Sequence, residues 1–147
     1  MQQKLKSILL IDDDEPTNFF SSLLIEDADC TENIQIAESG QRALGLLNSD
    51  VLPSPDLIFL DINMPAMDGW EFLEKYKQLP KEHQGKIVII MLTTSLNPDD
   101  REKASKIKEI SGFETKPLTP ELINKVLLKY FHSPTEVQLN PELTKSI

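Results

Sequence analysis

Polar side chains that could form a reactive site follow directly after apolar runs at four places in the sequence. These are Asp12, Asp13 and Asp14 after residues 5–11, Asp61 after residues 57–60 with Asn63 two positions later, Thr93 after residues 87–92, and Lys116 after residues 111–115. A carboxylate at the end of a buried strand is costly to desolvate unless a cation or a hydrogen-bond donor meets it. The acids, the hydroxyl and the lysine are therefore candidates for one shared site.

The magnitude of the repulsion between these acids indicates a metal ion. Two carboxylates about 5 Å apart repel by roughly 3 kcal/mol at an effective dielectric constant near 20. Three mutually close acids would cost on the order of 10 kcal/mol, which is comparable with the total stability of a domain. One lysine cannot fully offset that repulsion, whereas a divalent cation can, and Mg²⁺ prefers oxygen ligands. The acids therefore predict a Mg²⁺ site.

A metal ion held by few protein oxygens keeps open positions that phosphate commonly fills. Asp61 is then placed as a carboxylate nucleophile, as in proteins that form an aspartyl phosphate. Lys116 and the Thr93 hydroxyl would stabilise the oxygens of the transferring phosphoryl group. The expected chemistry is phosphoryl transfer to Asp61.

Strands and helices alternate five times along the sequence. We expect strands at residues 5–11, 34–37, 56–60, 87–92 and 111–115. We expect helices that begin near Pro16, Ser39-Gly40, Asp68-Gly69, Asn97-Pro98 and Thr119-Pro120. In the first helix, which we expect to end near Glu26, Phe19, Phe20, Leu23 and Leu24 recur at helical spacing, which indicates an apolar packing face.

Such alternation predicts a parallel sheet covered on both faces, that is, a three-layer α/β/α sandwich. Ligands of an open parallel sheet bind outside the carboxyl ends of its strands. Those ends carry the polar residues described above, so the fold class and the candidate site support each other.

The bulk composition fits one domain of ordinary size, with 147 residues of which 39% are hydrophobic and 27% charged. The formal net charge of −9 disfavours nucleic-acid and membrane-surface roles, so we expect neither partner. The single cysteine, Cys30, rules out an intrachain disulfide. No signal peptide or membrane span is evident, and we expect a cytoplasmic protein.

Four ordered stretches, "LLIDDDEP", "DLIFLDINMPAMDGW", "IIMLTTS" and "GFETKPL", resemble the receiver domain of two-component response regulators, of the chemotaxis-receiver type. The resemblance covers the chain from about Leu5 to Phe131. It implies a doubly wound five-stranded parallel sheet with the strand order 2-1-3-4-5, the flavodoxin-like arrangement. We expect a receiver domain at residues 1–131 and a C-terminal tail at 132–147, with no room for an output domain.

The resemblance also implies roles for individual residues. Asp61 matches the phospho-acceptor, Asp13 a direct metal ligand, Asp12 the acid that usually acts on the metal through water, and Asn63 a ligand through its backbone carbonyl. Thr93 matches the switch hydroxyl, Lys116 the lysine of the family motif, and Phe113 the switch aromatic, where tyrosine is more usual. The phosphoryl donor would be a phosphohistidine on a sensor histidine kinase or a phosphotransfer protein, with Mg²⁺ required.

Phosphorylation would then draw Thr93 toward the new oxygens and let Phe113 turn into the vacated space. This change would remodel the surface of the fourth helix, fifth strand and fifth helix, where an output protein binds. The fourth helix carries a basic patch of Arg101, Lys103, Lys106 and Lys108, which is either a partner site or an ordinary solvated face.

Two other functions remain open at this point. A metal-dependent phosphatase on a similar α/β fold would turn over an external substrate, but its Asp-x-Asp-x-Thr pattern is absent, since Asn63 and Pro65 follow Asp61. A degenerate receiver would serve as a constitutive scaffold, against which the intact acids and Lys116 argue.

Overall fold

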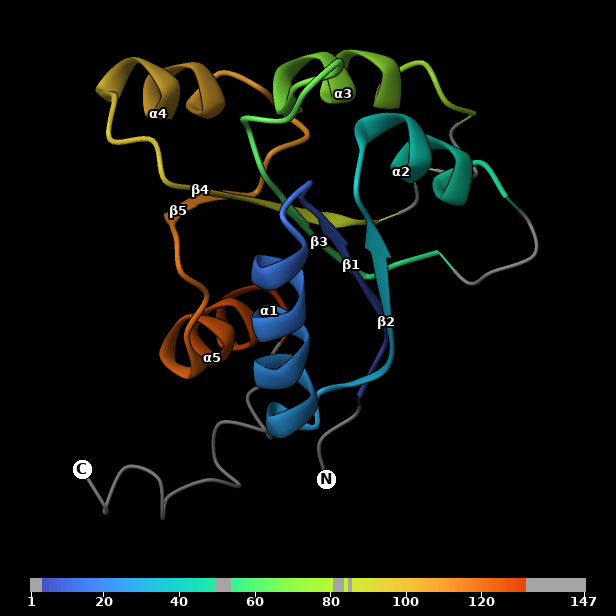
Figure 1. Cartoon of the computed structure of the whole chain (residues 1–147), viewed down its shortest axis with the longest axis vertical. Coiled ribbons are helices and arrows are strands. Elements are labelled where there is room, and N and C mark those ends of the chain that lie inside the picture. Colours follow the sequence, from blue (N-terminus) through green and yellow to red (C-terminus); the bar gives the residue numbers. More distant parts are fainter. Residues whose placement is uncertain (1–3, 50–53, 81–83, 85, 132–147) are drawn as a thin grey trace.

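The computed structural model describes residues 4–49, 54–80, 84 and 86–131 of the chain. Figure 1 shows a central sheet with helices on both of its faces. The tail that the sequence analysis assigns to residues 132–147 lies outside the described residues. Within the described part, no helix combines the length and the apolar character that crossing a membrane requires.

The described strands form one five-stranded parallel sheet. Its strands are β1 (Leu5–Ile11), β2 (Thr31–Ala37), β3 (Leu57–Leu60), β4 (Val88–Thr93) and β5 (Gly112–Thr115). They lie in the order β2-β1-β3-β4-β5, which confirms the expected order 2-1-3-4-5 and the flavodoxin-like fold. The strand β2 begins three residues earlier than the sequence predicts, because Thr31 pairs with Leu5 at the start of β1.

Five helices of the described residues cover the sheet, and they confirm the three-layer sandwich. They are α1 (Glu15–Ala28), α2 (Gly40–Leu47), α3 (Gly69–Tyr76), α4 (Pro98–Ser105) and α5 (Pro120–Tyr130). The helices α1 and α5 lie on one face of the sheet, and α2, α3 and α4 lie on the other (Figure 1). The buried apolar side chains accordingly form two clusters, one on each face of the sheet.

Each helix starts at the capping residue that its sequence indicates. The side chains of Asp14, Ser39, Asp68, Asn97 and Thr119 each accept a hydrogen bond from a backbone N–H of the first turn. At α3 the cap is reciprocal, since the Glu71 carboxylate also accepts from the Asp68 N–H. Such caps satisfy N–H groups that have no partner within the helix, and so they fix where each helix begins.

The expected packing face of α1 is wrong for three of its four residues. Phe19, Phe20 and Leu23 are 59%, 64% and 45% exposed. The buried residues of α1 are instead Asn18, Ser21 and Ile25. The Asn18 side-chain amide donates a hydrogen bond to the backbone carbonyl of Asp12, so the side of the helix that carries Asn18 faces the end of β1.

Candidate functional site

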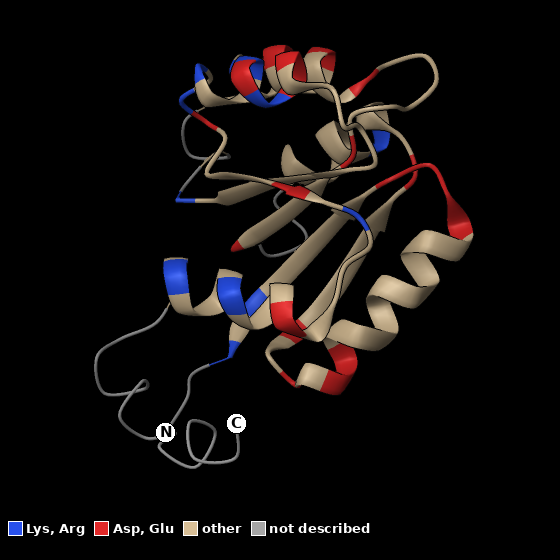
Figure 2. Cartoon of the chain, turned by 90° about the vertical axis from the view of Figure 1, so that its left-hand side faces the viewer, with Lys and Arg blue, Asp and Glu red and all other residues tan. Residues whose placement is uncertain are grey.

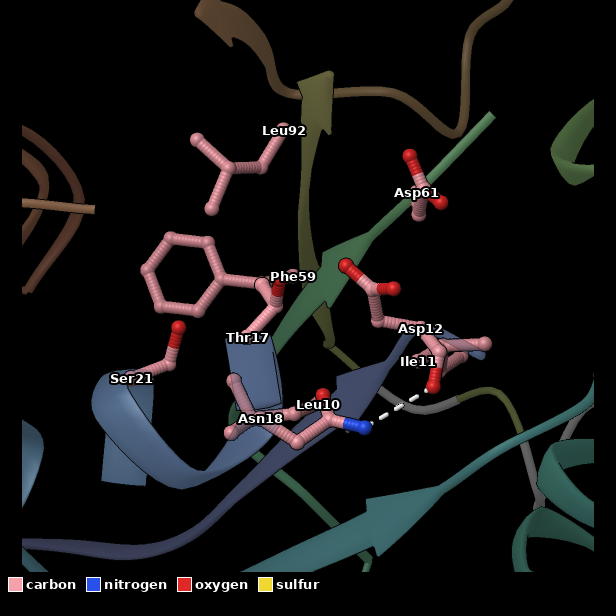
Figure 3. Close-up of a pocket in the computed structure, with 9 residues that line it drawn as sticks. All are labelled: Leu10, Ile11, Asp12, Thr17, Asn18, Ser21, Phe59, Asp61 and Leu92. Atoms are coloured by element: carbon pink, nitrogen blue, oxygen red, sulfur yellow. Dashed lines mark hydrogen bonds between the residues drawn. The ribbon is translucent and has the colours of Figure 1, made fainter. Parts of the chain in front are cut away.

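Asp12 comes directly after β1 and is held from several directions. Its carboxylate accepts a hydrogen bond from the Asp14 N–H at 2.9 Å, and its backbone carbonyl accepts one from the Asn18 amide at 2.9 Å. Its own N–H donates to the Ala37 carbonyl at the end of β2. Figure 3 shows the Asn18 contact and the Asp12 carboxylate directed toward the same region as Asp61. The Asp12 side chain is therefore buried and fixed in place.

Asp61 follows β3 and lies beside Asp12 because the two strands are neighbours. Its N–H donates to the carbonyl of Ile11 at 2.9 Å, which continues the β1–β3 pairing by one residue. The loop after Asp61 turns back on itself, and the Gly69 N–H donates to the Ile62 carbonyl at 2.7 Å. A Cβ atom at Gly69 would lie 2.6 Å from the Asp61 carbonyl oxygen, so this close approach requires glycine.

Carboxylate oxygens of Asp12, Asp13 and Asp61 all lie within 4.8 Å of one another. Asp12 and Asp61 are buried, and Asp13 is exposed. A compact set of carboxylate oxygens with one side open to solvent fits the ligand preference of Mg²⁺, which retains several waters. Asn63 lies two residues beyond Asp61 in the β3–α3 loop and is exposed. Asp14, by contrast, caps α1, as the sequence indicates for this residue.

Lys116 follows β5 and reaches both buried acids. Its ammonium nitrogen lies 2.5 Å from Asp12 Oδ2 and 3.4 Å from Asp61 Oδ1. Its backbone N–H donates to the Thr93 carbonyl at 2.8 Å, and its peptide bond to Pro117 is cis. The structure therefore brings together the ends of β1, β3 and β5, as the sequence pattern predicts.

The electrostatics of the site favour a further cation. Burial raises the pKa of Asp61 above its ordinary value, and the nearby Asp12 charge adds to the shift, although Lys116 opposes it. Burial by itself would lower the pKa of Lys116, but its hydrogen bond to Asp12 and the charges of both acids outweigh that effect, so this pKa is raised. Lys116 thus pairs with two of the three clustered carboxylates, which leaves net negative charge at the site.

Thr93 and Phe113 lie near this cluster without joining it. The Thr93 hydroxyl is fully buried, and its oxygen accepts a hydrogen bond from the Ser95 N–H at 3.1 Å. Phe113 is half-buried on β5, three residues before Lys116. The guanidinium of Arg101 on α4 lies 4.9 Å from the centroid of the Phe113 ring.

Sequence reasoning missed Asn18, which supports Asp12 from behind. Asparagine is uncommon within helices because its side chain competes for backbone hydrogen bonds. An asparagine four residues after the Asp14 cap, next to an acidic run, was the available signal.

A cavity of about 370 Å³ lies between α1 and the loop that carries Lys116. Its lining is mostly apolar and includes Phe20, Leu24, Leu92, Pro117 and Leu118, with Thr94 and Lys116 at the side of the acidic cluster. Figure 2 shows that α1 is uncharged through its middle turns and acidic at its ends. An apolar surface therefore borders the polar site.

Comparison with known proteins gives consistent matches. The sequence model of the family described as "Response regulator receiver domain" matches residues 8–128. An uncharacterized 14.6 kDa protein in the sodA1 3′ region of Leptolyngbya boryana is 34% identical over 81% of this chain and 86% of its own length. The signal transduction histidine-protein kinase BarA of Escherichia coli K12 is 31% identical over 88% of this chain, which spans only 13% of that kinase.

Solved structures match in the same way. A two-component response regulator from Cytophaga hutchinsonii is 34% identical with a TM-score of 0.78, over 86% of this chain and 97% of that one. The Vibrio cholerae chemotaxis protein CheY4 is 26% identical with a TM-score of 0.70, over 85% of this chain and 98% of that one. These matches cover the strands and helices that build the site.

Proposed function

Because the chain belongs to the response regulator receiver domain family, we propose that Asp61 accepts a phosphoryl group from a histidine kinase or phosphotransfer protein in a Mg²⁺-dependent reaction. The observation that carries this proposal is the cluster itself. Carboxylates of Asp12, Asp13 and Asp61 lie within 4.8 Å of one another, and the Lys116 ammonium lies between two of them.

In the proposed reaction a carboxylate oxygen of Asp61 attacks the phosphorus of a phosphohistidine. The new O–P bond forms as the N–P bond breaks, and the imidazole nitrogen keeps the bonding electron pair. Mg²⁺ would be held by Asp12, Asp13, Asp61 and the Asn63 backbone carbonyl, and it would neutralise charge on the phosphoryl oxygens when bound. Lys116 would bind one of these oxygens, and the Thr93 hydroxyl would donate to another.

The apolar side of α1 is the proposed docking face for the phosphodonor protein. Phe19 and Phe20 are more than half exposed, and Phe20 lines the cavity that adjoins Lys116. Large apolar side chains grouped on a surface commonly mark protein interfaces. A donor protein seated there would lie beside the cavity that Lys116 lines, and Lys116 contacts Asp61.

The output would pass through the surface of α4, β5 and α5. A phosphoryl group adds a charge of about −1.5 to −2, which would attract the Thr93 hydroxyl and free space for the Phe113 ring. The altered surface would bind an output protein. The proposal places this exchange in the cytoplasm.

Acetyl phosphate supplies the test, since it is a small phosphodonor that needs no partner protein. Incubation with acetyl phosphate and Mg²⁺ should add the mass of one phosphoryl group, and Asp61→Asn should abolish the adduct. The matched control is Asp56→Asn, because Asp56 lies just before β3, and its carboxylate accepts from the Lys6 N–H. An adduct that survives Asp61→Asn would reject the assignment.

The proposal also makes this chain a signalling module with no external substrate. Incubation with a generic phosphoester and Mg²⁺ should release no phosphate beyond one equivalent per protein. Sustained turnover would favour the phosphatase alternative.

A further inference from the structure

The helix α4 is attached to the rest of the protein mainly through polar contacts. Ala104 is its one buried residue, so apolar burial contributes little to its position. Ser95 Oγ donates a hydrogen bond to Asp100 in its first turn. On its sides, Arg101 lies over the Phe113 ring and Lys103 lies over the Trp70 ring, at 4.9 and 4.6 Å from the ring centroids. Such an attachment can be changed by small shifts in the neighbouring rings.

The basic patch expected on the fourth helix lies only partly on α4, which ends at Ser105, because Lys106 is the C-cap and Lys108 lies beyond it. Its members other than Lys108 make contacts within the protein. Besides the two ring contacts, Lys106 pairs with Glu102 at 3.5 Å. Arg101 makes two contacts with one residue, because its Nη1 also donates to the Phe113 carbonyl at 3.4 Å. The guanidinium is thus fixed over the ring by a second point of attachment.

The ring that Arg101 covers is the aromatic side chain at the switch position. One side of Phe113 packs against the core cluster between the sheet and α2, α3 and α4. The guanidinium covers it from α4, within the range of about 6 Å over which a cation is attracted to a ring face. Because phenylalanine has no hydroxyl group, the ring cannot anchor itself by a hydrogen bond in either position.

We propose that Arg101 is a latch that holds Phe113 in the position of the unphosphorylated protein. This inference rests on the proposed function, since it concerns the ring movement that phosphorylation of Asp61 would drive. Turning the ring toward Thr93 would separate it from the guanidinium. If the contact between Arg101 and Phe113 exists only in the unphosphorylated state, it stabilises that state and so opposes any ligand that favours the phosphorylated one. A cation–ring contact at an exposed site shifts the equilibrium between the two ring positions by roughly two- to fivefold.

Beryllofluoride, a phosphoryl mimic, allows this coupling to be measured without a kinase. Titration with beryllofluoride and Mg²⁺, followed by NMR spectra, should show a roughly two- to fivefold higher apparent affinity for Arg101→Gln than for the parent protein. The loss of a positive charge alone would lower the affinity for an anion, so the expected direction is diagnostic. Lys106→Gln removes the same charge at the C-cap of α4 and should not raise the affinity.

A second variant tests whether Arg101→Gln changes the beryllofluoride affinity through the Phe113 ring. In a Phe113→Leu background, Arg101→Gln should change the affinity no further, because the ring contact is already lost. The Arg101 side-chain protons should also carry a ring-current shift that beryllofluoride removes in the parent protein. An unchanged affinity in Arg101→Gln, an equal gain in the Phe113→Leu background, or a ring-current shift that persists would overturn the latch. A parent protein that binds no beryllofluoride would instead refute the proposed function and the latch with it.

Discussion

The Lys116 ammonium group lies 2.5 Å from the carboxylate of Asp12, a residue 104 positions earlier in the chain. The same nitrogen lies 3.4 Å from Asp61, so one cation bridges two buried acids from different strands. These side chains are only 8–14% exposed, and solvent therefore screens them weakly. Lys116 thus connects the ends of β1, β3 and β5 through its ion pairs, and it is also a candidate phosphate ligand.

Replacing Lys116 with methionine should destabilise the protein in the absence of Mg²⁺. Two buried carboxylates would lose their counter-charge, and removing one partner of a buried ion pair costs about 3–5 kcal/mol. Mg²⁺ should restore part of this loss, so its stabilising effect should be larger in the variant than in the parent. Urea unfolding with and without Mg²⁺ measures both effects.

Lys125→Met is the matched control for this prediction. Lys125 pairs with Glu114 at 2.9 Å, but its side chain is 58% exposed. Its loss should change the free energy of unfolding by less than about 1 kcal/mol. Equal losses in the two variants would show that the Lys116 bridge is no stronger than a surface pair.

Replacing Asn18 with alanine should weaken both the fold and Mg²⁺ binding. The Asp12 carbonyl would lose its hydrogen bond from a buried amide, at a cost of about 1–3 kcal/mol. Residues that orient metal ligands typically contribute about 10–100-fold to metal affinity. Ser22→Ala on the same helix should leave Mg²⁺ affinity unchanged and should not lower stability, because it removes a hydroxyl that is buried without a hydrogen-bond partner among the described residues. Mg²⁺ titration and urea unfolding of both variants test this, and unchanged Mg²⁺ affinity in Asn18→Ala would count against a positioning role.

The buried Tyr76 phenol should cause a specific loss of stability in alkaline solution. Burial raises the pKa of Tyr76 to about 12, and the charge of Glu109 adds to the shift. The unfolded chain would lose this phenol proton near the ordinary value of 10, before the folded protein does. The contribution of the Tyr76 phenol to the free energy of unfolding is therefore complete below about pH 10 and is lost as the pH rises toward 12.

The variant Tyr76→Phe isolates this contribution. It should be less stable than the parent by about 1 kcal/mol at neutral pH, because the phenol donates to the Gln84 carbonyl at 3.2 Å. The difference should shrink or reverse between pH 10 and 12, as measured by urea unfolding at each pH. A constant difference across that range would show that the phenol ionises equally in both states.

Much of the candidate site follows from the sequence because its parts obey simple rules. Polar residues after apolar strands must meet at one edge of a parallel sheet, which places Asp12, Asp61 and Lys116 together. The helix starts follow from their capping side chains, of which Asp14 and Asn97 are examples. These rules are local or topological, and no side-chain packing is needed to apply them.

The remaining features depend on tertiary contacts that no periodicity encodes. The spacing of Phe19, Phe20 and Leu23 indicates an apolar face, but α1 buries Asn18, Ser21 and Ile25 instead and leaves that face exposed. The charges on α4 are visible in the sequence, whereas the rings that Arg101 and Lys103 cover come from β5 and α3. Such pairings depend on how the layers pack.

Gly69 marks the start of a helix in the sequence, and it is also required by a close backbone contact that the sequence does not reveal. The sequence indicates a helix start at Asp68-Gly69, which the structure confirms, yet glycine is required there by the backbone of the site. An added Cβ would lie 2.6 Å from the Asp61 carbonyl oxygen and 3.0 Å from the Ile62 Cα. Both neighbours are backbone atoms, so the loop after Asp61 would have to move.

Replacing Gly69 with alanine should therefore destabilise the protein by about 1–3 kcal/mol and weaken Mg²⁺ binding, because the displaced loop carries Asp61 and Asn63. Gly45→Ala makes the same chemical change in α2, where an added Cβ meets nothing within 4 Å. That control should be more stable than the parent by roughly 0.5–1 kcal/mol, since alanine favours the helix. Urea unfolding and Mg²⁺ titration of the two variants should thus give changes of opposite sign in stability and a loss of affinity only for Gly69→Ala. Similar behaviour of the two variants would mean that the contact between Gly69 and Asp61 does not shape the site.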